Sequence, residues 1–99
     1  MPQIKLSRRA RNDLPRLYRF LAQWDEAIAS EGIDTILRAF ELISWPESGT
    51  PVPDRKGLRK LLIDLGSSGY TALYRFSKKT DTIVVLAIKH QKEKDYTES

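Results

Sequence analysis

Residues 82–90, TIVVLAIKH, are the stretch that most restricts the fold of this chain. The uninterrupted apolar run from Ile83 to Ile88 leaves no polar face, and a strand of this kind is buried on both faces. We therefore expect it to be the central strand of a sheet. It ends on Lys89 and on His90, which is the only histidine of the chain. The run is far shorter than the ~20 apolar residues that a membrane helix needs, so no membrane segment is expected.

The composition predicts one small domain that is held together by packing alone. With 99 residues, 40% of them apolar and 30% charged, the chain has a globular composition and little room for a second core. We expect a single domain over residues 1–99. The absence of cysteine excludes disulfides and, with one histidine, argues against a structural zinc site. The N-terminal residues lack the apolar stretch of a secretory signal. We therefore expect a cytoplasmic protein with no cofactor, no metal and no small-molecule substrate.

A helical hairpin is predicted over residues 8–45, after a short strand at residues 1–6. Its first helix carries apolar residues at alternating steps of four and three, which is the spacing of one helix face. These residues are Ala10, Leu14, Leu17, Leu21 and Trp24. Ser7 is the expected N-cap. Because the apolar stripe keeps its phase through Pro15, we expect the proline to bend the helix, and the alternative is a helix that begins near Asn12.

The second helix is expected to begin after Asp25, which is a good N-cap residue, and to stop at Trp45. Its apolar face is formed by Ile33, Ile36, Leu37, Phe40 and Ile43. Since few residues separate the two helices, they should form an antiparallel pair. Trp24 and Trp45, at the two ends of the hairpin, are expected to pack within it. Gly32 is expected to weaken the second helix by about 1 kcal/mol relative to alanine.

Three strands are predicted over residues 58–90, after a loop rich in proline and glycine at residues 46–57. They span residues 58–65, 70–77 and 82–90, and the short turns between them make two hairpins. Tyr70, Tyr74 and Phe76 share one face of the second strand, which we expect to lie in the core. The predicted order, β-α-α-β-β-β, is an α+β fold in which the helical hairpin packs on one face of a mostly antiparallel sheet.

Positive charge, +4 overall at pH 7, is concentrated in two stretches. Residues 5–19 carry six basic side chains against Asp13, and residues 55–60 carry four basic side chains and no acid. Residues 89–99 balance three lysines against Glu93, Asp95 and Glu98. Such clusters favour acidic partners, either nucleic acid or an acidic protein segment, although they also occur as solvated faces. The expected partner-binding residues are Arg8, Arg9, Arg11, Arg55, Lys56, Arg59, Lys60, Lys89, His90, Lys92, Lys94 and Tyr96.

Five stretches, in this order along the chain, resemble the RelE/ParE superfamily of toxins from bacterial toxin–antitoxin modules. They are ARNDLPRLYRFL, FELISWPESGTPVPD, GLRKLLI, SSGYTALYRF and VVLAIKHQKEKDY, and together they span nearly the whole chain. A histidine after the final apolar strand is typical of ParE-like members. The resemblance implies a small protein that arrests bacterial growth unless a cognate antitoxin binds it. ParE-like members block DNA gyrase without performing chemistry, whereas RelE-like members cleave messenger RNA in the ribosomal A site.

The resemblance also suggests which residues would act in a RelE-like nuclease. His90 and Tyr96 occupy the positions of an arginine and a tyrosine of those nucleases, and histidine is a suitable general base or acid. Arg59 and Arg75 are further candidates. A second nuclease arginine, just after the Ser-Gly-Tyr turn, corresponds here to Thr71. The lysines of the preceding strand correspond to Leu62 and Asp64.

We therefore expect a gyrase inhibitor whose residues 90–96 form a contact surface. A ribosome-dependent RNase that uses His90 and Tyr96 is the alternative. A relic module that binds an antitoxin but is no longer toxic is the third possibility. All three predict the same partner, an acidic antitoxin segment that is disordered until it binds.

Overall fold

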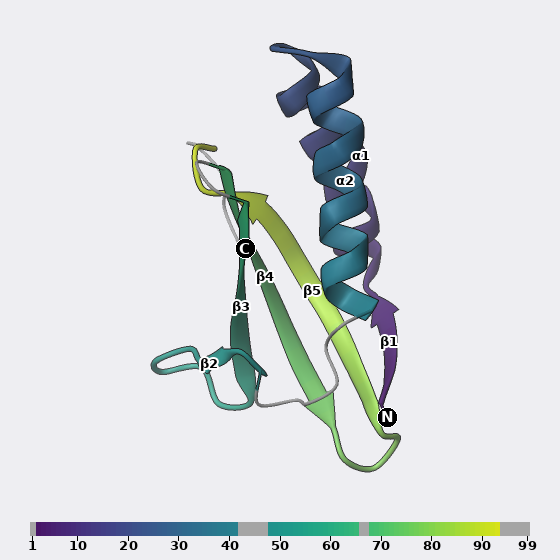
Figure 1. The fold of residues 1–99 in the computed structure, drawn as a ribbon. Helices are drawn as coiled ribbons and strands as arrows, with labels where there is room; N and C mark the ends of the chain where they lie inside the picture. The colour runs from purple at the N-terminus through teal and green to yellow at the C-terminus, as the bar shows by residue number, and fades with distance from the viewer. Residues whose placement is uncertain (1, 42–47, 66–67, 94–99) are drawn as a thin grey trace.

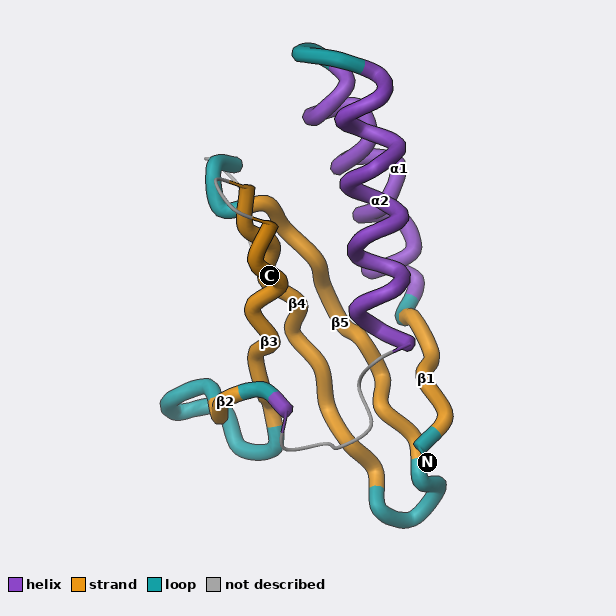
Figure 2. The backbone as a smooth tube through the Cα atoms, viewed as in Figure 1, coloured by secondary structure: helices purple, strands orange, loops and turns teal. Residues whose placement is uncertain are grey.

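The structure, a computed structural model, describes residues 2–41, 48–65 and 68–93 (Figure 1). Its elements are β1 (Gln3–Leu6), α1 (Arg8–Ala22), α2 (Glu26–Glu41), β2 (Thr50–Pro51), β3 (Leu58–Leu65), β4 (Ser68–Ser77) and β5 (Thr82–His90). The predicted α+β fold is confirmed. The α1–α2 hairpin lies over one face of a five-stranded sheet, and the short β2 is the only described strand that the sequence pattern did not predict (Figure 2).

The strands lie in the order β1-β5-β4-β3-β2. All neighbours are antiparallel except β1 and β5, which are parallel from Gln3 opposite Thr82 to Leu6 opposite Val85. The expectation that residues 82–90 form the central strand was wrong, because the N-terminal β1 adds on the far side of β5 and makes β4 the middle strand. β5 is nevertheless an interior strand, and residues on both of its faces are buried, as its apolar sequence requires.

Local signals in the sequence place both helices. Ser7 is the N-cap of α1, and its Oγ accepts a hydrogen bond from the Ala10 N–H at 3.0 Å. The helix runs through Pro15 to Ala22, so the alternative start near Asn12 is wrong. Asp25 Oδ1 accepts from the Ala27 N–H at 2.6 Å and caps α2, as predicted. None of the described helices is long and apolar enough to cross a membrane.

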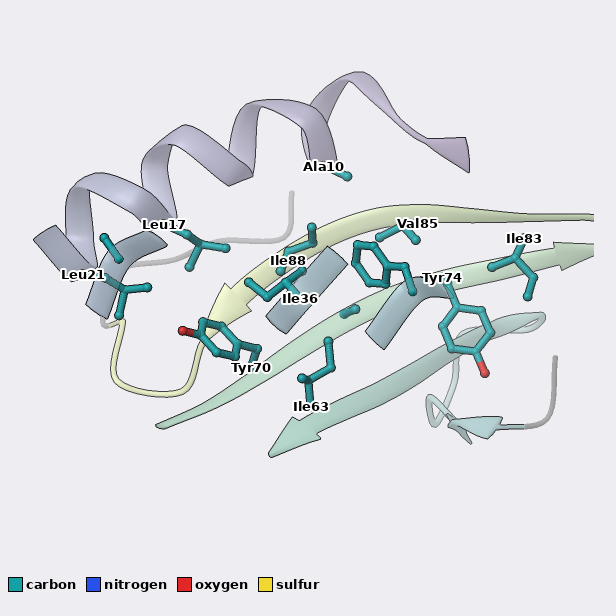
Figure 3. Packing of buried hydrophobic residues seen from close by; sticks show 13 residues of the cluster. Ala10, Leu17, Leu21, Ile36, Ile63, Tyr70, Tyr74, Ile83, Val85 and Ile88 are labelled. Carbon is teal, nitrogen blue, oxygen red and sulfur yellow. The ribbon is translucent and has the colours of Figure 1, made fainter. Parts of the chain in front are cut away.

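The main core lies between the hairpin and the sheet (Figure 3). Leu17 of α1 and Ile36 of α2 pack there against Tyr74 of β4 and Ile88 of β5, and all four are fully buried. Tyr70 is also buried, so the aromatic face of β4 belongs to the core, as predicted. A smaller buried cluster lies apart from this core and consists of Leu58, Leu73 and Ala87, with Val52 and Leu86 against it.

Two apolar residues that we expected in the hairpin packing are exposed instead. Trp24 is 62% exposed because the tip of the hairpin extends beyond the end of β5, where the sheet no longer covers it (Figure 1). Leu37 is 40% exposed because α2 turns the stripe Ala29–Gly32–Ile36–Phe40 toward the core. The predictions for Ile43 and Trp45 fall outside the described residues.

Gly32 has a packing role that helix propensity did not reveal. A Cβ atom at this position would lie 2.5 Å from Tyr70 Oη and 2.7 Å from Leu21 Cδ1. Both distances are shorter than real Cβ contacts allow. The glycine therefore permits α2 to approach α1 and β4 at this point of the core.

Candidate functional site

Among the described residues, no strand lies beside the outer edge of the second half of β5, because β1 ends at Leu6 opposite Val85. The start of α1 continues the pairing from there. The Ser7 N–H donates to the Val85 carbonyl at 2.9 Å, and Ser7 Oγ donates to the carbonyl of Leu86 at 3.1 Å. Leu86 is the residue left without a partner at the register shift between β4 and β5. The N-cap residue of α1 thus also supplies hydrogen-bond donors to the carbonyl groups at this edge of β5. Backbone groups that are removed from water need such partners.

Further along the same edge, two side chains of α1 hold both backbone groups of Ile88. Asp13 Oδ2 accepts from the Ile88 N–H at 2.8 Å, and Arg16 Nη2 donates to the Ile88 carbonyl at 2.7 Å. Asp13 is only 5% exposed, and its other oxygen accepts from Arg16 Nη1. Arg16 also reaches past the strand, since its Nε and Nη2 each donate to one carboxylate oxygen of Glu93 at 3.0 Å. We refer to Asp13, Arg16, Ile88 and Glu93 as the α1–β5 clamp.

Glu93 connects the clamp to the end of β5. Its Oε1 also accepts from the His90 N–H at 2.9 Å. Burial raises the pKa of the Glu93 carboxyl, but the hydrogen bonds from Arg16 and from the His90 N–H, together with the Arg16 charge, outweigh burial and leave the pKa below its ordinary value. The carboxylate is therefore ionised at neutral pH, and it fixes the course of the chain just after β5.

His90 is 2% exposed and lies between two aromatic rings. Its ring centroid is 5.3 Å from that of Phe20 and 5.1 Å from that of Tyr70. Burial lowers the pKa of His90, and the charge of Glu93 only partly opposes this effect. Because Nδ1 accepts a hydrogen bond from the Lys92 N–H at 3.0 Å, the neutral ring carries its proton on Nε2. This Nε2 is buried and has no hydrogen-bond partner among the described residues.

A cavity of about 210 Å³ opens beside His90, between the tip of the hairpin and the end of β5. It is lined by Leu21 of α1, Trp24 of the turn after α1, Ile28 of α2, His90 and Lys92. Trp24 is 62% exposed and Ile28 is 49% exposed, so two large apolar side chains lie at the rim of the cavity. We refer to it as the hairpin-tip cavity.

The predicted basic residues lie at separate places. Arg8 and Arg11 are exposed on the first turn of α1, with Arg9 half-buried beside them, whereas Arg16 of the same basic stretch belongs to the clamp. In the second cluster, Arg55, Lys56 and Arg59 line an open cavity of about 640 Å³ near β2. Lys60 is exposed on β3, and Lys89 is half-buried on β5. Lys94 and Tyr96 fall outside the described residues.

Sequence reasoning missed Asp13, Arg16 and Glu93 as a unit. One signal for it was present, because Asp13 lies between Ala10 and Leu17 on the buried face of α1. A carboxylate on an apolar helix face needs a partner. Within the described ranges, no group of three or more histidine, cysteine or acidic residues is placed to hold a metal ion.

Residues 4–95 match the family described as the ParE toxin of the type II toxin–antitoxin system parDE. The chain belongs to this family. A further relative of this ParE-family toxin is Toxin RelE3 of Caulobacter vibrioides, which is 33% identical over 95 residues that cover 95% of this chain and 99% of the relative. The predicted membership of the RelE/ParE superfamily is thus confirmed.

Two solved structures share the fold of this ParE-family toxin. One is from the chromosomal ParDE system of P. aeruginosa, with a TM-score of 0.73 and 21% identity, covering 90% of this chain and 95% of that one. The other is from the intact RelBE toxin–antitoxin complex of E. coli, with a TM-score of 0.56 and 14% identity, covering 94% of this chain and 100% of that one.

In the ParE-family toxin described here, the candidate nuclease residues lie on two faces of the sheet. Residues that pair directly across antiparallel strands point to the same face. His90 pairs with Tyr70, and Arg59 pairs with Tyr74, so both lie on the face that the hairpin covers. Their positions are four residues apart along β4, about 14 Å at the usual strand rise. Arg75 alternates with Tyr74 and lies on the opposite face.

Proposed function

We propose that this ParE-family toxin arrests growth by binding and inhibiting DNA gyrase, that it performs no chemistry, and that a cognate antitoxin neutralises it. The separation of His90, Arg59 and Arg75 over two faces of the sheet is the observation that most supports this proposal. Metal-free RNA cleavage needs a base, an acid and a cation that all reach one phosphate. In the described residues, these candidates do not converge on one point.

The environment of His90 also supports a non-catalytic role. A general base must come within hydrogen-bond reach of the proton that it removes. His90 is buried between two rings, its Nδ1 is occupied by the Lys92 N–H, and its pKa is lowered by burial. A ring in this setting is a poor acceptor for a proton of a bulky RNA substrate.

Among the described residues, the opposite face of the sheet near the end of β5 offers few groups for a phosphate. There Leu62, Thr71 and Lys89 are direct neighbours across three strands, so this row contributes one cation. Stabilising the charge of a phosphorane usually takes several cationic donors around it. The composition of this row therefore favours a binding surface over a nuclease centre.

The antitoxin part of the proposal is supported by the relatives. The solved structures with this fold come from a ParDE system and from an intact RelBE complex, in which toxin and antitoxin are bound together. This chain has a net charge of +4, which suits an acidic partner segment.

A ribosome-dependent mRNA endonuclease is the second candidate function. It is favoured by the 33% identity to a relative that is named RelE3. In that case His90 and Tyr96, with Arg59 and Arg75, would be the residues to mutate first. Because His90, Arg59 and Arg75 lie far apart on the sheet, the bound RNA would have to contact them at separate places.

DNA supercoiling by purified gyrase tests the proposal. We expect the toxin to abolish supercoiling or to trap cleaved DNA, and pre-mixing with the cognate antitoxin to restore activity. If a folded and toxic preparation leaves gyrase unaffected while it cleaves messenger RNA on ribosomes, the proposal is wrong and the second candidate replaces it.

A further inference from the structure

We propose that the hairpin-tip cavity is a docking site for the antitoxin, which inserts one large apolar side chain of an acidic segment between Trp24 and His90. This inference rests on the proposed function only in taking the antitoxin as the partner. The site itself is defined by the apolar rim, the volume and the buried donor.

The rim is apolar and already ordered. Trp24 and Ile28 are 62% and 49% exposed and line the same cavity. The Trp24 ring packs edge-on against Phe20, with the ring centroids 5.1 Å apart, so little side-chain freedom is lost when a partner covers it. Tryptophan is one of the residues that are enriched among the hot spots of protein–protein interfaces.

The volume indicates what kind of group enters. Pockets for small molecules usually measure about 300–1,000 Å³, and this cavity measures about 210 Å³. It is therefore suited to one side chain of a larger partner rather than to a free metabolite. The partner's remaining contacts would lie on the surface around the rim.

His90 gives the site a polar requirement. Its Nε2–H is buried, has no hydrogen-bond partner among the described residues, and belongs to a ring that lines the cavity. A buried donor without an acceptor costs about 1–3 kcal/mol, and the His90 ring would have to shift for a bound acceptor to reach Nε2 and remove that cost. A backbone carbonyl or a carboxylate of the entering segment would supply that acceptor.

The hydrogen bonds around His90 keep the proton of the neutral ring on Nε2. The Lys92 N–H occupies Nδ1, which leaves the proton of the neutral ring on Nε2. Glu93 holds the His90 N–H and is itself held by Arg16. Lys92 also lines the cavity, and its positive charge favours an acidic residue next to the inserted side chain.

Titration calorimetry with the cognate antitoxin tests the site. We expect Trp24→Ala to weaken binding about 30-fold and Ile28→Ala about 5-fold, because truncation of a central tryptophan anchor costs most. Leu37→Ala is the matched control, since Leu37 is a similarly exposed residue (40%) of the same helix but does not line the cavity. We expect its affinity to stay within 2-fold.

The NMR signal of the His90 Nε2–H proton provides a second measurement. Unfolding of the protein would not produce the change that is expected in this signal. We expect it to move downfield and to exchange more slowly with solvent when wild-type toxin binds the antitoxin. An unchanged signal, already protected in the free toxin, would mean that the toxin itself fills the cavity and would overturn the inference. Loss of a toxin dimer in the Trp24→Ala variant would assign the cavity to a second copy and would also overturn it.

The two proposals fail in different ways. If the antitoxin binds the wild type and both cavity variants equally well, the docking site is wrong and the toxin–antitoxin pairing stands. If the antitoxin does not bind the folded wild type at all, the pairing in the proposed function fails first.

Discussion

The guanidinium of Arg16 donates to both carboxylate oxygens of Glu93, a residue 77 positions further along the chain. The same guanidinium holds Asp13 and the carbonyl of Ile88. One side chain of α1 thereby fixes the last turns of the described chain against the helix.

Glu93→Gln is expected to destabilise the protein by about 1–2 kcal/mol. The substitution removes the charge of a bidentate pair whose members are 29% and 10% exposed, so the loss exceeds that of a surface pair. Urea unfolding measures the change as a lower midpoint. Glu31→Gln, at an exposed position of α2, is the control and should shift stability by less than about 0.5 kcal/mol. Equal effects of both substitutions would contradict this view of the pair.

Stability should fall in acid in a way that depends on Glu93. Because the pKa of Glu93 is lowered on folding, its contribution is present above the ordinary carboxyl pKa of 4.5 and is lost as the pH falls through the folded value. Unfolding measured from pH 6 to pH 2 should therefore show a shallower acid limb for Glu93→Gln than for the wild type. If stability falls equally steeply in acid in both proteins, folding does not lower the pKa of the Glu93 carboxyl.

Asp13→Ala is expected to cost about 3 kcal/mol, because it leaves the Ile88 N–H without its acceptor and removes a charge that Arg16 contacts. Hydrogen exchange locates the effect, since the Ile88 amide should exchange much faster in the variant. Asp13→Asn, which keeps an acceptor oxygen of the same reach, should restore part of the protection. Unchanged exchange at Ile88 in the alanine variant would show that the strand edge does not need the helix.

His90 should titrate below its ordinary pKa of 6.5, since burial lowers the pKa. The unfolded state then takes up a proton more readily than the folded state, so stability should decline as the pH falls below 6.5 and level off below the folded pKa. An NMR titration of the ring gives the midpoint directly. A midpoint above 6.5 would mean that the charge of Glu93 outweighs burial.

Gly32→Ala should destabilise the protein by about 1–3 kcal/mol, although alanine is the better helix former. The added Cβ would meet Tyr70 Oη at 2.5 Å and Leu21 Cδ1 at 2.7 Å. Tyr70→Phe removes the nearer of these atoms, and it should recover part of the loss when combined with Gly32→Ala. Thermal unfolding of the four members of this cycle measures the coupling. Additive effects would rule out the close contact as the cause.

Local patterns predicted the parts of the fold that depend on neighbouring residues. The cap at Ser7, the cap at Asp25 and the buried β5 each follow from a few adjacent side chains. The exposure of Trp24 could not be predicted in this way, because its place in the apolar stripe is regular. What decides its exposure is that the tip of the hairpin extends beyond the end of β5, which is a property of the assembled fold (Figure 1).

The candidate site was predicted less well for a related reason. Alternation along each strand fixes that Tyr74 and Arg75 point to opposite faces, but the register between strands decides which residues of β3 and β5 join them. Leu86, left without a partner at the register shift, changes that alignment midway along β5. Asp13 was counted only as one acid in a basic stretch, although its place among buried residues required a partner.

The parallel pairing of β1 with β5 has a consequence for how the chain folds during synthesis. β1, which is synthesised before the other described strands, pairs with β5, which is synthesised after them, and the α1–β5 clamp is complete only with Glu93. Contacts of such high sequence separation form late and slow folding. α1 and β1 therefore cannot complete their packing until β5 and Glu93 have left the ribosome.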